Sequence, residues 1–342
     1  MLKFIEVKGN DYEIGYQIGQ HFKKYLKNKI IDFDKKVHLA ETEIEFLKNK
    51  LENTFPNLLH EIYGRADGAN ISRKSFLLMV FPEIYERIDG CTTVIVKKEN
   101  SVLFAHNEDN EDFNLENVAL IKYNYGDRFI ISYTMAERLA GSAFSYNSNG
   151  LLFSSNYVFD ENLNLDNLSR YIVVRDVINS KNIEEVLQKL KDNDVASAFS
   201  LSVLDINTNQ VINIEKDIHE IYVTEIKDNY ARSNHFHVKE HDESKDPEDS
   251  KFRYKKTNEL INKLDVENCC LNDLLNILKY QTDDYYKCVY KQYGKFMNLS
   301  VTDATLCIDT SQNYFKIYDY IGKSILKISI DGNLLEQSLQ KN

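Results

Sequence analysis

The chain changes its structural pattern within the stretch IDGCTTVIVKKENSVLFAHNED, residues 88–109. Before it, residues 1–90 carry apolar side chains at helical spacing, as in DYEIGYQIGQHFKKYL and IEFLKNKLENTFPNLLHEIYGRADGA. After Gly90, the segments CTTVIV and VLFAH have strand-like composition, and the polar turn KKENS joins them. A largely helical segment therefore gives way at Cys91 to a β-hairpin.

Strand pairs and helices alternate along the rest of the chain. Hairpin turns are expected at Gly126-Asp127 and at Asn149-Gly150, the strongest such signal in the sequence. Helices are expected in 165–194, 252–265 and 270–280, and the charged run 239–251 is expected to be a solvated loop. The connections between strands are too short for parallel crossovers, so antiparallel sheets with helices packed outside fit best.

Composition excludes several classes of protein. The 342 residues are 43% hydrophobic and 28% charged, which is ordinary for a globular chain, and the net charge of −11 argues against a general nucleic-acid binder. The longest apolar stretch, FLLMVF at 76–81, is far too short to span a membrane, and the first residues lack the apolar core of a signal peptide. Five cysteines without a CxxC pair indicate reduced thiols. We therefore expect a soluble cytoplasmic protein that binds neither nucleic acid nor membranes.

Cys91 is the first candidate for chemistry, because it begins a strand directly after a glycine that leaves the preceding carbonyl open to approach. A lone cysteine beside a strand is more often a small buried apolar residue. The hairpin, however, returns Asp109 to the neighbourhood of Cys91, since paired strands lie about 4.8 Å apart. A carboxylate beside a thiol and an amine is what an N-terminal nucleophile needs. Asn156 and Asn234 add side-chain amides that can donate to an oxyanion.

Taken together, these segments resemble the autoproteolytic acyltransferases typified by isopenicillin N acyltransferase, within the N-terminal-nucleophile (Ntn) hydrolase superfamily that also holds the choloylglycine hydrolases. The resemblance lies in the opening helix with Gly15 and Gly19, the segment ending in DGCTT, the acidic box FAHNEDN, the hairpin SYNSNGLLFSSNYV and the box ARSNHF. It implies an α+β fold, a four-layer αββα sandwich of two antiparallel sheets with helices outside, formed by residues 1–342 as a single domain.

The resemblance also implies an activity. The chain would cut itself between Gly90 and Cys91, and the helical segment 1–90 would stay bound to the catalytic chain 91–342 as a heterodimer. The freed α-amine of Cys91, with an ordinary pKa of about 7.7–8.0, would serve as the base for its own thiol. Asp109 would hold the amine or thiol in place, Asn234 would donate to the oxyanion, and Asn156 would be a second donor or a substrate contact.

The implied substrate is a small-molecule linear amide or acyl donor, whose acyl group passes through a Cys91 thioester to water or to another acceptor. No metal or redox cofactor is implied, and a coenzyme A thioester would be a substrate. His106, Glu108, His235 and Asn298 are candidates for substrate contacts. His106 stands where relatives often carry Arg or Gln. Since no arginine follows Arg253, the role of the family's late arginine falls to Lys295, to Asn298 or to nothing.

Three other interpretations remain open. Cys91, His235 and Asn234 could form a Cys-His-Asn site in an uncut hydrolase. The fold could also serve a catalytically silent binding protein. A zinc site at His235, His237 and His241 is disfavoured, because no cysteine or glutamate stands at a matching spacing. Self-association of the heterodimer is left open.

Overall fold

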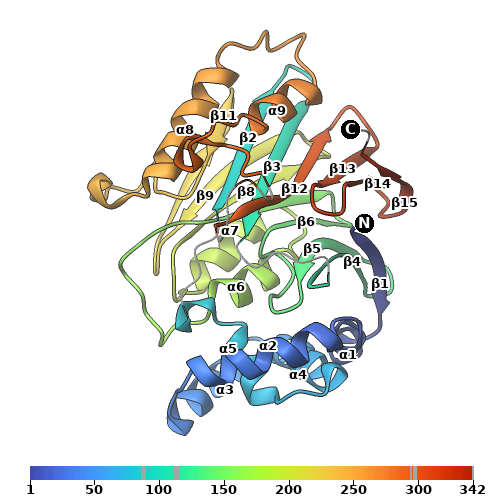
Figure 1. The fold of residues 1–342 in the computed structure, drawn as a ribbon, viewed down its shortest axis with the longest axis vertical. Coiled ribbons are helices and arrows are strands. Elements are labelled where there is room, and N and C mark those ends of the chain that lie inside the picture. The colour runs from blue at the N-terminus through green and yellow to red at the C-terminus, as the bar shows by residue number, and fades with distance from the viewer. Residues whose placement is uncertain (86–89, 111–115, 293–294, 296–298, 341–342) are drawn as a thin grey trace.

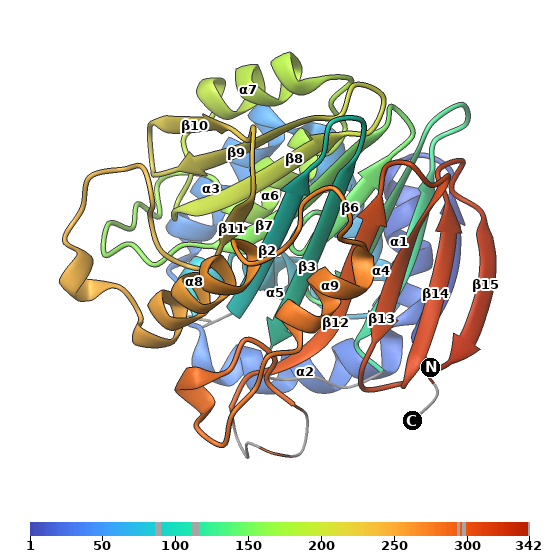
Figure 2. The ribbon, with the colours of Figure 1, turned by 90° about the horizontal axis from the view of Figure 1, so that it is seen from above.

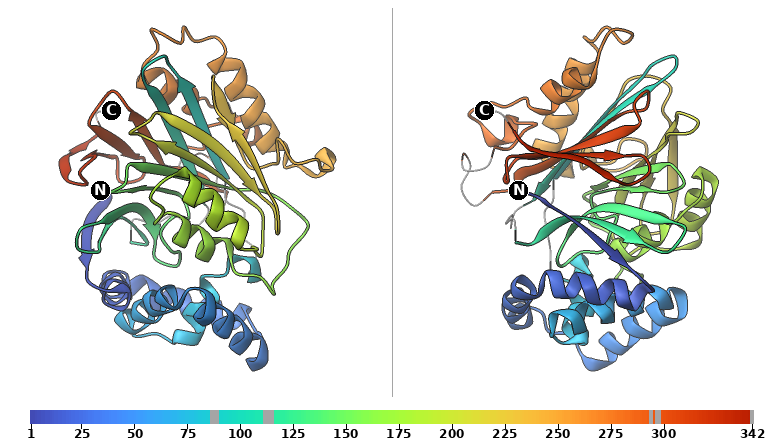
Figure 3. Two further views of the ribbon diagram at one scale, coloured as in Figure 1. Left: turned by 180° about the vertical axis from the view of Figure 1, so that it is seen from behind. Right: turned by 90° about the vertical axis from the view of Figure 1, so that its right-hand side faces the viewer.

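Two β-sheets lie face to face with helices on both outer sides in the computed structural model, which describes residues 1–85, 90–110, 116–292, 295 and 299–340 (Figure 1). Views from above and from the side show the helices α1–α5 gathered below the first sheet, and α8 and α9 above the second (Figures 2 and 3). The αββα sandwich expected from the sequence is confirmed.

The first sheet has eight strands in the order β1-β4-β5-β6-β7-β8-β9-β10. Their bounds are β1 (Lys3–Lys8), β4 (Val118–Asn124), β5 (Phe129–Met135), β6 (Phe144–Asn147), β7 (Leu151–Tyr157), β8 (Phe199–Asp205), β9 (Gln210–Lys216) and β10 (Ile221–Glu225). The expected turns at Gly126 and Gly150 are present, and both glycines have positive φ angles.

One edge of this sheet corrects the sequence-based prediction. Residues 3–8 form a strand rather than part of a helical segment, and β1 pairs with β4 in parallel, so the sheet is not purely antiparallel. The parallel pairing is possible because five helices and a hairpin separate the two strands in the chain, which leaves ample length for a crossover.

The second sheet has seven strands in the order β11-β2-β3-β12-β13-β14-β15. Their bounds are β11 (Tyr230–Arg232), β2 (Gly90–Lys97), β3 (Val102–Asn110), β12 (Val301–Asp309), β13 (Tyr314–Asp319), β14 (Ser324–Ser329) and β15 (Leu334–Leu339). The hairpin of β2 and β3 is the one expected from residues 91–109. The last two strands, β14 and β15, were not anticipated from the sequence.

Helices cover the outer faces of both sheets. Their bounds are α1 (Asp11–His21), α2 (Lys23–Lys36), α3 (Glu41–Thr54), α4 (Pro56–Ala69), α5 (Arg73–Met79), α6 (Arg170–Val177), α7 (Ile183–Asp192), α8 (Glu248–Ile261) and α9 (Leu271–Leu278), with single 3-10 turns at Pro82–Ile84, Glu243–Lys245 and Tyr285–Lys287. The expectation of a solvated loop through 239–251 is wrong at its end, because α8 begins at Glu248. Acidic residues in its first turn favour a helix start there.

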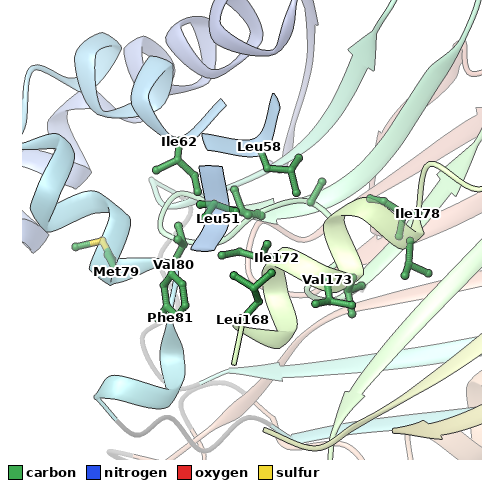
Figure 4. Close-up of a cluster of buried hydrophobic side chains, with 14 of the residues drawn as sticks. Leu51, Leu58, Ile62, Met79, Val80, Phe81, Leu168, Ile172, Val173 and Ile178 are labelled. Carbon is green, nitrogen blue, oxygen red and sulfur yellow. The ribbon is translucent and has the colours of Figure 1, made fainter. Parts of the chain in front are cut away.

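Apolar side chains fill the space between the two sheets and the space between each sheet and its helices. Side chains of segment 1–85 meet those of α6 beneath the first sheet (Figure 4); they include Leu51, Leu58, Ile62, Val80, Phe81, Leu168, Ile172, Val173 and Ile178. Between the sheets, Ile95 and Phe104 of the second sheet share a cluster with Leu120 and Tyr133 of the first. Segment 1–85 is thus an integral part of the sandwich.

Helices α1 and α4 cross with their backbones in contact. A Cβ atom on Gly15 would lie 2.1 Å from the carbonyl oxygen of Glu61, and one on Gly64 would lie 2.1 Å from that of Tyr12. Gly19 and Gly68 make the same close approach one turn further along. The paired glycines of the opening helix therefore exist because side chains do not fit at this crossing.

Candidate active site

Cys91 is the second residue of β2, and each of its polar groups contacts a buried side chain. The thiol donates to Oε2 of Glu108, at 3.2 Å. The main-chain N–H donates to Oδ1 of Asn234, at 3.0 Å, and the carbonyl oxygen accepts from Nη1 of Arg253, at 2.5 Å. Only 2% of Cys91 is exposed. The hairpin expected from the sequence thus presents the cysteine in a fixed orientation.

The register of β2 and β3 decides which carboxylate meets the thiol. Cys91 pairs with Glu108, and Gly90 pairs with Asp109. A Cβ atom on Gly90 would lie only 2.9 Å from Oδ2 of Asp109, whose Oδ1 accepts from the hydroxyl of Thr302 at 2.6 Å. Glu108 therefore contacts the thiol, while Asp109 lies against Gly90, the residue before the expected cut. Burial raises the pKa of Asp109.

Arg253 is a site residue that the sequence analysis did not single out. Besides the carbonyl of Cys91, it donates through Nη2 to Oδ1 of Asn234, at 2.7 Å, and to Asp249, at 3.2 Å. The amide nitrogen of Asn234 donates in turn to the carbonyl oxygen of Tyr157. Asn234 thus binds the main-chain N–H of Cys91, and Arg253 binds both the carbonyl of Cys91 and the side chain of Asn234.

A second buried cation, Lys291, lies beside Gly90. Its Nζ is 3.0 Å from Asp249 and 3.9 Å from Oδ2 of Asp109. Burial and Arg253 oppose the charge on Lys291, but Asp109 and Asp249 raise its pKa above the ordinary value. Burial likewise opposes ionisation of Asp249, yet Arg253 and Lys291 lower the pKa of that carboxyl. Asp109, Arg253 and Lys291, which are buried, and the partly exposed Asp249 thus form a group of acidic and basic side chains next to Gly90.

Lys291 lies in the same late region as Lys295 and Asn298, the two residues considered for the role of the family's late arginine. Lys295 instead donates to the carbonyl of Thr282 and pairs with the exposed Asp283. Asn298 lies outside the described residues. Nothing in the local sequence marks Lys291, since its two partners come from β3 and α8.

His106 is fully buried beside the thiol. Its Nδ1 is 2.9 Å from the hydroxyl of Thr93, and its Nε2 is 3.5 Å from Oε2 of Glu108. The donor atoms of Cys91, His106 and Glu108 all lie within 4.8 Å of one another. Burial lowers the pKa of His106 to about 3, so its imidazole is neutral.

Asn156 reaches the same region from β7 of the opposite sheet. Its Oδ1 accepts from the hydroxyl of Thr93 at 3.1 Å, and its buried Nδ2 has no hydrogen-bond partner among the described residues. A buried donor left unpaired costs about 1–3 kcal/mol. An oxyanion would give this amide a partner, so the unpaired Nδ2 is consistent with the donor role expected for Asn156.

His235 makes its contacts with its own loop and with α8. Its Nδ1 lies 2.8 Å from the hydroxyl of Ser250, and its ring packs against His237 and Tyr254. Burial and the charge of Arg232 lower the pKa of His235 to about 3. Within the described part of the chain, the ligand atoms of His235, His237 and His241 do not gather into a three-residue group.

A cavity of about 760 Å³ opens beside Gly90, the residue before Cys91. A volume of this size accommodates a small-molecule ligand. Its walls combine Gly90, Asn234, Arg253 and Lys291 of the site with aromatic and acidic side chains, which are Tyr157, Phe159, Tyr285, Tyr286, Glu83, Asp160, Glu161 and Asp249. Glu83 belongs to segment 1–90, so both sides of the expected cut contribute to the cavity. A larger open hollow of about 1120 Å³ is bordered by none of these residues.

Comparison with known proteins places the chain in a family. Residues 96–312 match the model of the acyl-coenzyme A:6-aminopenicillanic acid acyl-transferase family, and the chain belongs to that family. The matched range contains Asp109, Asn156 and Asn234, and begins five residues after Cys91.

Individual relatives agree with this assignment. The chain is 26% identical over 230 residues to the beta-alanyl-dopamine/carcinine hydrolase of Drosophila melanogaster, covering 57% of this chain and 59% of that protein. It thus spans about three fifths of the length of this curated relative. Crystal structures of two variants of the conjugated bile acid hydrolase from Clostridium perfringens share the fold, with TM-scores of 0.50 at 16% and 15% identity, and cover 74% of this chain and 97% of theirs. The part of the chain that the structure describes contains no helix long and apolar enough to cross a membrane.

Proposed function

We propose that the chain cuts itself between Gly90 and Cys91, and that the freed Cys91 then hydrolyses a linear amide through a thioester. One observation carries this proposal: three buried side chains separately hold the thiol, the N–H and the carbonyl of Cys91, and the preceding Gly90 lines a cavity. A structural cysteine has no need of such contacts. A thiol that must attack the preceding carbonyl needs its backbone and its sulfur fixed together.

Each site residue has its own role in the proposed reaction. After the cut, the α-amine of Cys91 accepts the thiol proton, and Asn234 keeps that amine in place. Asn156 donates its unpaired amide to the oxyanion of the tetrahedral intermediate. Asp109 and Lys291 lie where the carboxylate of Gly90 forms and leaves. The reaction needs no metal or redox cofactor, and we place the enzyme in the cytoplasm.

For the substrate we propose β-alanyl amides of small aromatic amines. The support is the likeness to a hydrolase of beta-alanyl-dopamine and carcinine, together with the lining of the cavity. A β-alanyl group ends in an ammonium, which carboxylates of the cavity wall can bind; of these, Asp160 and Glu161 pair with Lys239 and Lys245 and would exchange a lysine for the substrate's ammonium. Tyrosine and phenylalanine rings can pack against the aromatic amine. Transfer to another acceptor, such as coenzyme A, would use the same thioester, and exclusion of water would set the balance.

The test is release of the free amine from carcinine and from beta-alanyl-dopamine. We expect release by the native chain and by Cys270→Ala, which removes an exposed cysteine, but none by Cys91→Ala. N-acetylhistamine, which has the amide and the imidazole but no ammonium, should be cleaved at least tenfold more slowly. Equal cleavage of N-acetylhistamine would contradict the substrate class. Cleavage by Cys91→Ala would contradict the nucleophile.

A further inference from the structure

Self-cleavage, the first of the proposed reactions, cannot use the α-amine of Cys91, which is the base of the later turnovers. Before the cut, the nitrogen of Cys91 belongs to the peptide bond with Gly90, and an amide nitrogen cannot accept a proton near neutral pH. The thiol must nevertheless lose its proton to attack the carbonyl carbon of Gly90. Another group has to accept it.

Glu108 has the geometry for this task. Its Oε2 accepts the hydrogen bond of the thiol at 3.2 Å, within the range expected of a general base. Its Oε1 accepts from Nδ2 of Asn110 at 3.3 Å and lies 3.6 Å from Nη1 of Arg138. The cation and the amide thus lie on one carboxylate oxygen, and the other oxygen is directed at sulfur.

The neighbouring carboxyl does not compete for the negative charge. Asp303, on β12, accepts through Oδ2 from the hydroxyl of Tyr133 and from Asn110. Burial and the charge of Glu108 raise the pKa of Asp303 well above its ordinary value, which favours its protonated form. Of these two carboxyls, Glu108 is the one that lies beside the guanidinium of Arg138.

The two other candidate bases fit less well. His106 has its pKa lowered to about 3 by burial, and its Nδ1 is engaged with Thr93. A nitrogen with so low a pKa is a poor acceptor for a thiol proton. Asp109 faces Gly90, Thr302 and Lys291, while the thiol's contact is with Glu108.

From this geometry, and resting on the proposed self-cleavage, we infer that Glu108 is the catalytic base of the uncut chain and that the α-amine takes over only after the cut. Oε2 takes the thiol proton as sulfur bonds to the carbonyl carbon of Gly90. In the five-membered ring that results, sulfur and nitrogen are bonded to the same carbon, so the protonated Glu108 lies near both. It returns the proton to nitrogen as the carbon–nitrogen bond breaks, leaving an α-amine and a thioester. Water then adds to the thioester carbon, Gly90 leaves as a carboxylic acid, and the thiol regains a proton.

The inference is tested on freshly synthesised full-length chains, whose cutting is followed by intact mass. A chelator is present throughout, because a thiol, an imidazole and a carboxylate together could bind an adventitious metal ion. Glu108→Gln should slow the cut by about 100-fold or more, the range that general base catalysis contributes. Glu108→Asp keeps the carboxylate and should fall between Glu108→Gln and the native chain. Glu99→Gln, the same change on the exposed turn of the hairpin, should cut at the native rate.

Two readouts separate a base from a structural role. The residual cutting of Glu108→Gln should rise about tenfold per pH unit below the pKa of the thiol, because only the spontaneous thiolate then reacts, whereas the native profile should be flatter. Hydroxylamine, which cleaves thioesters, should not speed up Glu108→Gln, because formation of the thioester is then the slow step. Cutting of Glu108→Gln within threefold of the native rate, or its acceleration by hydroxylamine, would overturn the inference.

The outcomes also separate this inference from the proposed function. A native chain that never cuts, or a Cys91→Ala chain that does, contradicts the proposed self-cleavage. A native chain that cuts, a Cys91→Ala chain that stays whole and a Glu108→Gln chain that cuts normally contradict the role of Glu108 alone. If Glu108→Gln melts far below uncut Cys91→Ala, the pH profile of its residual cutting decides: a profile as flat as that of the native chain overturns the inference.

Discussion

At the scale of single residues, the site depends on side chains that fix the backbone of Cys91 as much as on those that touch its sulfur. Arg253 joins the carbonyl of Cys91, the amide oxygen of Asn234 and the carboxylate of Asp249. A planar guanidinium can serve three acceptors at once, whereas an ammonium cannot hold the same fork. The identity of this residue, and not only its charge, should therefore matter.

We predict that Arg253→Lys slows self-cleavage by about 10- to 100-fold. The change removes at least one charge-assisted hydrogen bond, which contributes about 1.5–3 kcal/mol. The fraction of cut chain over time, measured by intact mass, gives the result. Lys255→Arg, an exposed substitution on the same helix, should behave like the native chain. Native cutting by Arg253→Lys would show that positive charge alone suffices.

His106 gives a prediction about pH and stability. Its folded-state pKa of about 3 lies below the ordinary value of 6.5, so between these values the unfolded chain binds a proton that the folded chain does not. The stability that His106 contributes is thus complete above pH 6.5 and is lost as the pH falls toward 3. The slope is at most about 1.4 kcal/mol per pH unit.

Urea unfolding of uncut Cys91→Ala between pH 4 and 7 measures this slope. Adding His106→Gln should flatten the fall in stability at low pH, while adding His60→Gln, on the exposed side of α4, should leave it unchanged. An unaltered slope in the His106→Gln chain would mean that this imidazole is not held neutral.

How far the sequence predicts the site depends on how local each signal is. Cys91, Glu108 and Asp109 lie on one hairpin, so their proximity follows from strand pairing. The register does not, and a shift of one residue decides whether Glu108 or Asp109 meets the thiol. Arg253 and Lys291 come from distant elements, and only the tertiary fold brings them to Gly90.

At the scale of elements, the crossing of α1 and α4 shows how four glycines define a helix pair. At Gly15 and Gly64, the space for a Cβ atom is already taken by a backbone carbonyl of the other helix. A methyl group there cannot be absorbed by turning a side chain, so the helices would have to move apart.

Overpacking a core ordinarily costs about 1–3 kcal/mol. We predict that Gly64→Ala lowers the free energy of unfolding by more than this, even though alanine favours helices. Gln20→Ala, on the exposed face of α1, should change stability by less than about 0.5 kcal/mol. Thermal unfolding of both variants in the Cys91→Ala chain provides the comparison. A Gly64→Ala chain as stable as Gln20→Ala would refute the close crossing.

Elements with a strong local pattern were predictable, and those fixed by tertiary contacts were not. The hairpins at Gly126 and Gly150 and helices α6 and α7 follow the sequence pattern. Strand β1 was missed because its six residues precede a strong helical pattern and gain their partner only from β4. The start of α8 was missed because the charges of Asp249 and its neighbours indicated solvent, whereas Asp249 faces Arg253 and Lys291.

At the scale of the whole molecule, segment 1–90 contributes to the first sheet, to the apolar layer beneath it and to the cavity. It supplies strand β1, the apolar layer drawn in Figure 4 and Glu83 of the cavity. The buried ion pairs of Glu61 with Arg65 and Arg175 add a polar link between α4 and α6. Cutting the peptide bond at Gly90 removes none of these contacts, so we propose that the two pieces stay together as one folded unit.

The most direct test of the central claim is the intact mass of the native chain beside Cys91→Ala, each measured under denaturing and under native conditions. For the native chain we predict two polypeptides under denaturing conditions, one ending at Gly90 and one beginning at Cys91, and a single complex of both under native conditions. For Cys91→Ala we predict one whole chain. A single full-length polypeptide for both chains, or a cut at any other bond, would contradict it.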